Sequence, residues 1–249
     1  MRLDVCRKLE MSEYKFVWAS PERPNIYYEV LPRSDVDTDI KPIVDDLRRN
    51  KLQMTRVIIY CRSLNVCSDL YAYFLSCLGE DSYFPPDAPK ISDNRLFGMY
   101  HANTPAHNKE VILNSMQKED GVVRVVFATV ALGMGVNLVG VNRVVHYGAP
   151  ASIDDYFQES GRAGRSGEAA TSTVYWKPSD APLRRDISDP RNVELAAVRH
   201  YLENNTSCRR QQLLNYFDSD LFSTIHCNDR LLCCDVCTRN VVKESVDTE

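Results

Sequence analysis

Two arginines three residues apart lie in the glycine-rich stretch QESGRAGRSG, at residues 158–167. The guanidinium group of arginine is a planar fork of hydrogen-bond donors that matches the oxygen atoms of a phosphate. On a helix, Arg162 and Arg165 would lie about one turn apart and point the same way. The stretch therefore predicts a phosphate-binding pair, and the alternative is a pair of solvated surface arginines.

A second glycine-rich stretch, ATVALGMGVN at residues 128–137, follows an apolar run. Ligands bind at the ends of the strands in open parallel sheets. Gly133 and Gly135 would allow the backbone to approach such a ligand more closely than a side chain permits. A tight turn that requires a positive φ is the alternative explanation for these glycines.

Five of the nine cysteines are crowded into the last fifth of the chain. Cys234 and Cys237 would put two thiolates on one turn, and Cys208 and Cys227 would complete a tetrahedral Zn²⁺ site. Four thiolate ligands leave no open position, so this zinc would be structural rather than catalytic. Cys233 is one cysteine too many, and a ligand swap with Cys234 stays open. Buried free thiols are the alternative for the whole group.

Strand-like and helix-like segments alternate around these motifs. Short β-branched runs predict five strands and helical spacing predicts three helices, with strands at 55–63, 95–102, 123–131, 141–150 and 171–178 and helices at 65–78, 106–120 and 153–165. This alternation predicts βαβ units, and hence an α/β domain whose parallel sheet is covered by helices on both faces.

Two proline-rich stretches punctuate the pattern. Residues 79–94 are expected to be a surface insertion, and residues 177–192 are expected to mark the end of the α/β domain. Helical segments at 193–205 and 208–217 follow, and Arg209 and Arg210 on the second of them would either form a positive patch for DNA or balance its charge.

Composition excludes several classes of protein. The net charge of −4 gives no overall basic field for a nucleic acid, so any such contact must come from a local patch. No apolar run approaches the roughly 20 residues that span a bilayer. The charged first residues show no signal peptide, and the odd number of cysteines argues against a disulfide framework. We expect a soluble intracellular protein without a membrane partner.

The order in which these motifs occur resembles that of a known protein family. A VIIYCRS strand, then YHA, ATVALGMGVN and QESGRAGRSG resemble, in that order, the second RecA-like lobe of superfamily 2 helicases. The glutamine that opens the last motif, the ATVA-GMG core and YHA are similar to the RecQ DNA helicases. The segment SPERPNIYYEV at 20–30 and the CRRxxLLxYF pattern, which resembles the RecQ zinc module, agree with this. DEAD-box RNA helicases would show HRxGRxGR instead, so the RNA class is the least favoured.

The resemblance implies a role for each candidate residue. Arg165 matches the family's arginine finger, which stabilises charge on the γ-phosphate of ATP during hydrolysis. Arg162 and Gln158 match positions beside the nucleotide, and Asn137, with Gly133 and Gly135, matches a nucleotide-binding segment in which related helicases hold the ribose. The positions that match DNA-phosphate contacts are Arg62, Ser63, His101 and Thr129; His101 could equally be a structural histidine.

The resemblance also implies what is missing. The first lobe of such helicases carries GxxxxGK[ST] and a Mg²⁺-binding acidic motif, and neither occurs in this sequence. We therefore expect ATP and Mg²⁺ to bind only together with a first RecA-like lobe, and the chain alone to be inactive. The expected domains are a lead-in from the first lobe at 1–33, a three-layer RecA-like lobe at 34–180, a helical zinc module at 181–240 and an acidic tail at 241–249.

Two hypotheses follow. The chain is the second lobe and zinc module of a nuclear, ATP-dependent 3′–5′ DNA helicase that works with a first lobe in cis or in trans. Alternatively, it is a stand-alone module that binds DNA or a protein without turnover.

Overall fold

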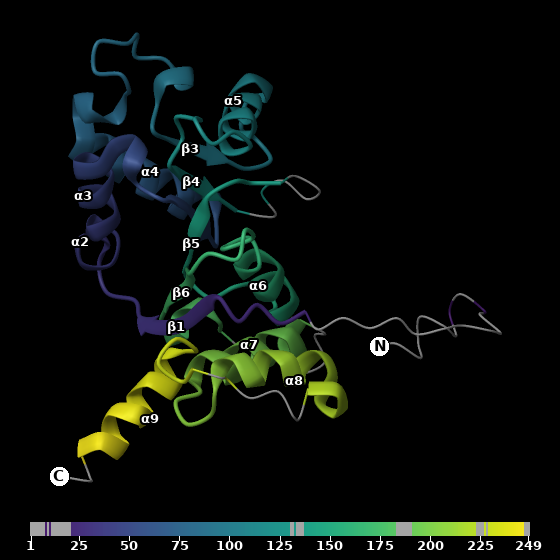
Figure 1. Ribbon diagram of the computed structural model, residues 1–249. Coiled ribbons are helices and arrows are strands. Elements are labelled where there is room, and N and C mark those ends of the chain that lie inside the picture. Colours follow the sequence, from purple (N-terminus) through teal and green to yellow (C-terminus); the bar gives the residue numbers. More distant parts are fainter. Residues whose placement is uncertain are drawn as a thin grey trace.

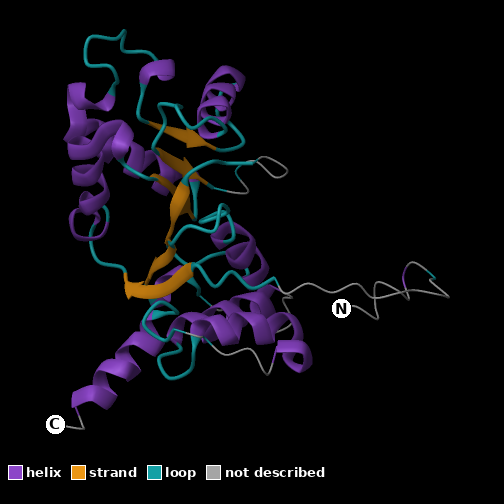
Figure 2. Ribbon diagram, in the orientation of Figure 1, coloured by secondary structure: helices purple, strands orange, loops and turns teal. Residues whose placement is uncertain are grey.

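The computed structural model describes residues 8, 10, 21–129, 132, 137–182, 191–222, 227 and 229–246. Across these residues, a parallel sheet is sandwiched between helices (Figures 1 and 2). The order of its strands is β1-β6-β5-β2-β4-β3, and every neighbouring pair is parallel. The strands are β1 Ile26–Pro32, β2 Arg56–Cys61, β3 Phe97–Tyr100, β4 Val125–Ala128, β5 Val141–Tyr147 and β6 Ala170–Trp176. The α/β prediction is confirmed.

The helices connect the strands and extend beyond them. Helices α2 Val36–Asp39, α3 Lys41–Asn50 and α4 Leu64–Leu78 lie on one side of the sheet, and α5 Ala106–Met116 and α6 Ile153–Ser160 lie on the other (Figure 1). Helices α7 Arg191–Glu203, α8 Arg209–Phe222 and α9 Asp235–Val246 gather beside β1 and β6, at one end of the sheet. Short 3-10 helices lie at Lys51–Gln53, Gly79–Ser82, Ser92–Asn94 and Pro178–Asp180.

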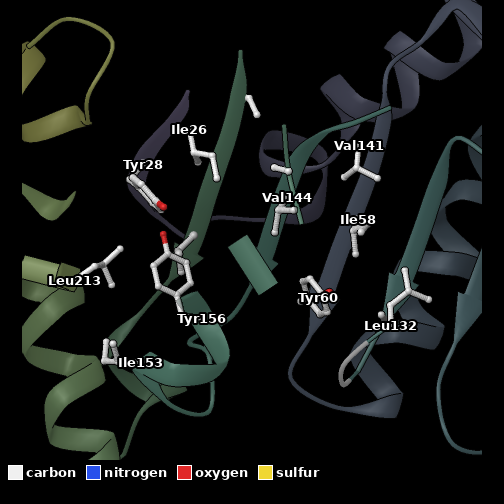
Figure 3. Close-up of a cluster of buried hydrophobic side chains, with 14 of the residues drawn as sticks. Ile26, Tyr28, Ile58, Tyr60, Leu132, Val141, Val144, Ile153, Tyr156 and Leu213 are labelled. Carbon is white, nitrogen blue, oxygen red and sulfur yellow. The ribbon is translucent and has the colours of Figure 1, made fainter. Parts of the chain in front are cut away.

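Strand β2 is buried along its whole length and shows why the sheet has two covered faces. Ile58 and Tyr60 point into one core cluster, whereas Val57, Ile59 and Cys61 belong to the other. Because side chains alternate between the two faces of a strand, a continuous apolar run fits a strand that is covered on both sides. Figure 3 shows the first cluster, in which the sheet packs against α6 and α8.

Three boundaries differ from the sequence-based expectation. The sequence predicts that residues 1–33 are a lead-in from a first lobe. Strand β1 lies within this range, so these residues contribute to the sheet. Helix α9 continues to Val246, so most of the expected tail is helical. The helix predicted at 153–165 ends at Ser160, and Gly164, inside the predicted range, has a φ of +58° that no right-handed helix contains. The insertion at 79–94 is ordered, and its Phe84 packs against the second core cluster.

Among the described residues, no helix is both long and apolar enough to cross a bilayer.

Candidate functional site: two edges of the sheet and a cysteine cluster

The two arginines lie in a series of turns at residues 161–168, which we call the arginine loop. Gly164 has a φ of +58°, and its N–H donates to the carbonyl oxygen of Val141 at 2.8 Å. A Cβ at this position would lie 2.4 Å from Asn25 Nδ2 and 2.7 Å from the Glu168 carbonyl oxygen. Only glycine fits this conformation and this close approach, so the prediction that both arginines share a helix is wrong.

The two arginines have different surroundings. Arg162 is buried, with 3% of its surface exposed. Burial raises the pKa of the Tyr60 hydroxyl, and the positive charge of Arg162 partly opposes that rise. Arg165 is exposed. Partial desolvation lowers the pKa of the Arg165 guanidinium, and the positive charges of Arg162 and Arg23 lower it further. Three guanidinium groups thus concentrate positive charge at this loop, and a bound anion would be stabilised there.

Arg165 and Asn137 line the same cavity, which has a volume of about 520 Å³. This amino-edge pocket lies at the beginnings of β2 and β5, where Thr55 and Val141 also contribute to its wall. Gln158, exposed on α6, and Arg162 do not line it. Gly133 and Gly135 lie outside the described residues. The structure therefore brings together two of the residues expected around a nucleotide.

Sequence reasoning missed two buried arginines in the wall of this pocket. Arg56 donates to the carbonyl oxygens of Met116 at 3.1 Å and Val139 at 2.6 Å, and Arg124 donates to that of Leu52 at 3.0 Å. Burial, followed by the charge of Arg124, lowers the pKa of Arg56 to about 10. A charged residue within an apolar run of the sequence, as in TRVIIYC and VVRVVF, was the signal that could have found them.

The opposite ends of the same strands form a second cavity of about 370 Å³. Arg62 and Thr129 line this carboxyl-edge pocket, together with His146 and Gly148. The His146 ring stacks on Tyr60, with the ring centres 5.2 Å apart. A strand such as β2 is about 20 Å long, so the two pockets lie at separate edges of the sheet.

The other two residues expected to contact DNA differ. Ser63 lies next to Arg62 and caps α4, since its hydroxyl accepts a hydrogen bond from the N–H of Val66. His101 lies in another cavity, beside Asn103 and Asn108 near β3 and α5. The structure therefore groups Arg62, Ser63 and Thr129 and leaves His101 apart.

The cysteines of the C-terminal region meet in one cluster. The sulfur atoms of Cys208, Cys233, Cys234 and Cys237 all lie within 4.8 Å of one another. Cys227 is joined to Cys233 by a disulfide bond with an S–S distance of 2.11 Å. The Cys208 sulfur lies 3.5 Å from each of these two sulfur atoms. The expected ligands thus come together, and Cys233, left over in the prediction, lies among them.

The donor set of this cluster fits zinc. Zn–S bonds of ~2.3 Å in a tetrahedron place sulfur atoms about 3.8 Å apart, close to the spacing seen here. The hydrogen bond between Cys208 and Cys234 lowers the pKa of the Cys234 thiol and raises the pKa of the Cys208 thiol, so the pair shares one proton, which a bound metal would displace.

Arg209 and Arg210 are both buried, with 2% and 4% of their surfaces exposed. Arg209 forms an ion pair with Asp235 and donates to the carbonyl oxygen of Tyr201 at 3.0 Å. Arg210 donates to the carbonyl oxygen of Ile26 at 2.8 Å. Arg209 thus links α8 to α7 and α9, and Arg210 links α8 to the start of β1. Burial excludes the expected alternative of a positive patch for DNA.

Comparison with known proteins gives two family matches. Residues 40–167 match the family described as helicase conserved C-terminal domain. Residues 184–238 match the family described as RecQ zinc-binding.

Individual proteins that are similar to this chain are also named as helicases. The chain is 28% identical to the ATP-dependent DNA helicase hus2/rqh1 of Schizosaccharomyces pombe, over 95% of this chain and 17% of that protein. It is 30% identical to the ATP-dependent DNA helicase RecQ of Pasteurella multocida, over 87% of this chain and 32% of that protein. A protein of Acanthamoeba polyphaga mimivirus whose name describes an ATP-dependent RNA helicase, R290, is 32% identical over 99% of this chain and 42% of its own length. The chain thus spans less than half the length of these relatives.

Among solved structures, the chain is similar to the Mycobacterium smegmatis helicase Lhr, with 18% identity and a TM-score of 0.47 over 72% of this chain and 21% of that chain.

Proposed function

The chain belongs to the RecQ family of superfamily 2 helicases, and we propose that it acts as the second lobe and zinc module of an ATP-dependent 3′–5′ DNA helicase. The observation that carries the proposal is the shared position of Arg165 and Asn137 on the wall of the amino-edge pocket. A first RecA-like lobe, in cis or in trans, supplies the phosphate cradle and the residues that hold Mg²⁺.

Arg165 acts on the charge that develops during ATP hydrolysis. Water attacks the γ-phosphorus, and the bond from that phosphorus to the oxygen bridging the β- and γ-phosphates breaks. The guanidinium of Arg165 donates hydrogen bonds to the γ-phosphate oxygens, where negative charge is spread in the transition state. Asn137 holds the ribose, whereas Arg162, within the arginine loop, and Gln158, on α6, do not line the pocket wall.

The carboxyl edge holds the DNA backbone. Arg62 is exposed there next to Ser63, with Thr129 in the same pocket. Contacts of these kinds position phosphates without reading the base sequence. His101 lies in a separate cavity and contacts DNA only where the DNA strand continues past β3.

The cysteine cluster holds one structural Zn²⁺. Cys208, Cys234 and Cys237 are three of its ligands, and Cys227 is the fourth in the reduced protein, with Cys233 beside it. When bound, the metal supplies a cross-link between the start of α8 and the start of α9. The cluster leaves no open coordination position, so it has no part in the hydrolysis.

We place the RecA-like lobe from β1 to residue 180 and the zinc module, which we call the cysteine module, from α7 to α9. By resemblance to the DNA helicases, the nucleus is the proposed location.

DNA-stimulated ATP hydrolysis tests the proposal. The purified chain is measured alone and after addition of a RecQ-type first lobe. We expect activity only in the mixture, because the arginine loop and the phosphate cradle lie on different lobes. Activity of the chain alone contradicts the account of a divided site. DNA binding without hydrolysis in either case supports a binding module instead.

A further inference from the structure

Arg23 fastens the arginine loop from a distant part of the sequence. Its guanidinium donates to the carbonyl oxygens of Gly161 at 3.1 Å, Ala163 at 3.0 Å and Gly164 at 2.6 Å. These carbonyls belong to turns, in which no helix ladder uses them. A charged donor forms stronger hydrogen bonds than a neutral one, so this single side chain fixes the path of the backbone on both sides of Arg162.

Asn25 adds a second grip on the same loop. Its Nδ2 donates to the carbonyl oxygens of Gly164 and Glu168, both at 2.7 Å. Its own carbonyl oxygen accepts a hydrogen bond from the N–H of Ala170 at 2.9 Å. The loop is therefore held at its beginning, its middle and its end by residues 23–26, which we call the strap.

The strap is held in turn by the cysteine module. Arg210 donates to the carbonyl oxygen of Arg23 at 2.5 Å and to that of Ile26 at 2.8 Å, and its guanidinium lies 5.4 Å from the centre of the Tyr28 ring. The N–H of Tyr28 donates to the carbonyl oxygen of Cys233 at 3.3 Å. Arg210 follows Cys208 by two residues, so both contacts come from the part of the module that surrounds the cysteine cluster.

We propose that the strap transmits the folded state of the cysteine module to the arginine loop, with Arg23 as the positioning residue for Arg165. When the module is intact, Arg210 holds the backbone of residues 23–26, and Arg23 then holds the carbonyls that flank the two loop arginines. Loss of the module releases the strap and lets the loop move. The charge of Arg23 is also close enough to lower the pKa of Arg165, which agrees with their proximity.

The consequence for ATP hydrolysis rests on the proposed function, but the mechanical link does not. Hydrogen exchange of backbone amides therefore tests the link without any catalytic readout. The amides measured are those of residues 161–168, in the full chain loaded with zinc. The reference amides are those of β2, whose exchange reports on the stability of the whole lobe.

The test variants are Arg23→Lys and Arg210→Lys, and Arg95→Lys is the matched control. Like Arg23, Arg95 is half-buried, but it donates to the hydroxyls of Tyr71 and Tyr83 far from the arginine loop. We expect both test variants to exchange the loop amides about tenfold faster, as expected from losing charged hydrogen bonds, with β2 unchanged. The control should leave the loop amides unchanged.

Removal of zinc with a chelator is expected to give the same acceleration in the loop. If a lysine variant also speeds hydrogen exchange in β2, Asn25→Ala is tested in its place. This change removes only the two hydrogen bonds that the Asn25 amide donates to the carbonyl oxygens of Gly164 and Glu168. Unchanged loop exchange in Arg23→Lys or Arg210→Lys, with β2 protected, overturns the strap. Failure to detect ATP hydrolysis in a lobe mixture overturns only the proposed function.

Discussion

The arginine loop and the cysteine module are held by different means. Carbonyls of the loop accept hydrogen bonds from side chains 138 to 143 residues earlier in the chain. The module is held by sulfur atoms between Cys208 and Cys237 and by the ion pair of Arg209 with Asp235. A region of the first kind depends on its neighbours for its shape, whereas a region of the second kind depends on contacts within itself and, as proposed, on a bound metal.

The difference fits what each region has to do. In the proposed role, a loop that meets a phosphate held by the first lobe needs an exposed cation and a fixed backbone behind it, and Arg165 and Gly164 provide these. Within the module, Arg209 and Arg210 are buried and the clustered cysteines are buried or half-buried. These two arginines therefore support the fold rather than presenting groups to a ligand, and Arg210 connects the module to the strap that holds the arginine loop.

The largest difference between the two regions is expected when a proposed metal ligand is removed from the cysteine module. Cys234→Ser removes a thiolate, and structural zinc sites provide much of the folding free energy of small modules. We expect elemental analysis to fall from about one zinc per chain to almost none, with loss of helical circular dichroism from α8 and α9. Cys77→Ser, at a half-buried free cysteine on α4, should keep its zinc. A folded, metal-free Cys234→Ser protein would falsify the account of the module.

A medium effect is expected within the loop. Gly164→Ala places a Cβ against Asn25 and Glu168 at a positive φ, so we expect the free energy of unfolding to fall by about 2–3 kcal/mol. Gly140 also has a positive φ, of +67°, but nothing lies within 4 Å of the added carbon. Gly140→Ala should therefore cost only about 1 kcal/mol. Urea unfolding of the two variants measures the difference, and equal costs would show that the loop is not tightly packed.

The smallest effect is expected at the carboxyl edge. Arg62→Ala removes one exposed cation, so we expect the affinity for single-stranded DNA to fall by about 1 kcal/mol and the slope of log K against log salt to fall by about one unit. Arg199→Ala, which removes a half-buried arginine paired with Glu203 on α7, is the control. Fluorescence anisotropy over a range of salt concentrations measures both. An unchanged slope for Arg62→Ala would remove this residue from the DNA path.

The sequence allowed prediction of features that local patterns determine. The run RVIIYC is a strand because every second residue faces one of two cores, and the cysteine cluster followed from the spacing of five thiols. The burial of Arg162 was not predictable, because it depends on where Tyr60 and α6 come to lie. The pairing of β1 with β6 and the contacts of Arg23 join residues more than 130 positions apart, and no periodicity records such contacts.

The end of helix α6 at Ser160 was only partly predictable from the sequence. The three glycines in GRAGRSG indicate a turn. The spacing of the two arginines also fits a helix, and the prediction followed that spacing. The positive φ of Gly164 and Gly167 shows that the glycines were the stronger indication. Residue types that require a particular backbone conformation constrain it more firmly than a spacing that merely permits a helix.

In the proposed function, Arg165 completes an ATP site on another lobe. Its most direct test is the kcat of DNA-stimulated ATP hydrolysis by the chain mixed with a RecQ-type first lobe, compared between the natural sequence and Arg165→Ala. We predict a decrease of about 10³-fold or more, with zinc content and the Kd for DNA unchanged. An Arg165→Ala protein that hydrolyses ATP at the original rate would contradict the claim.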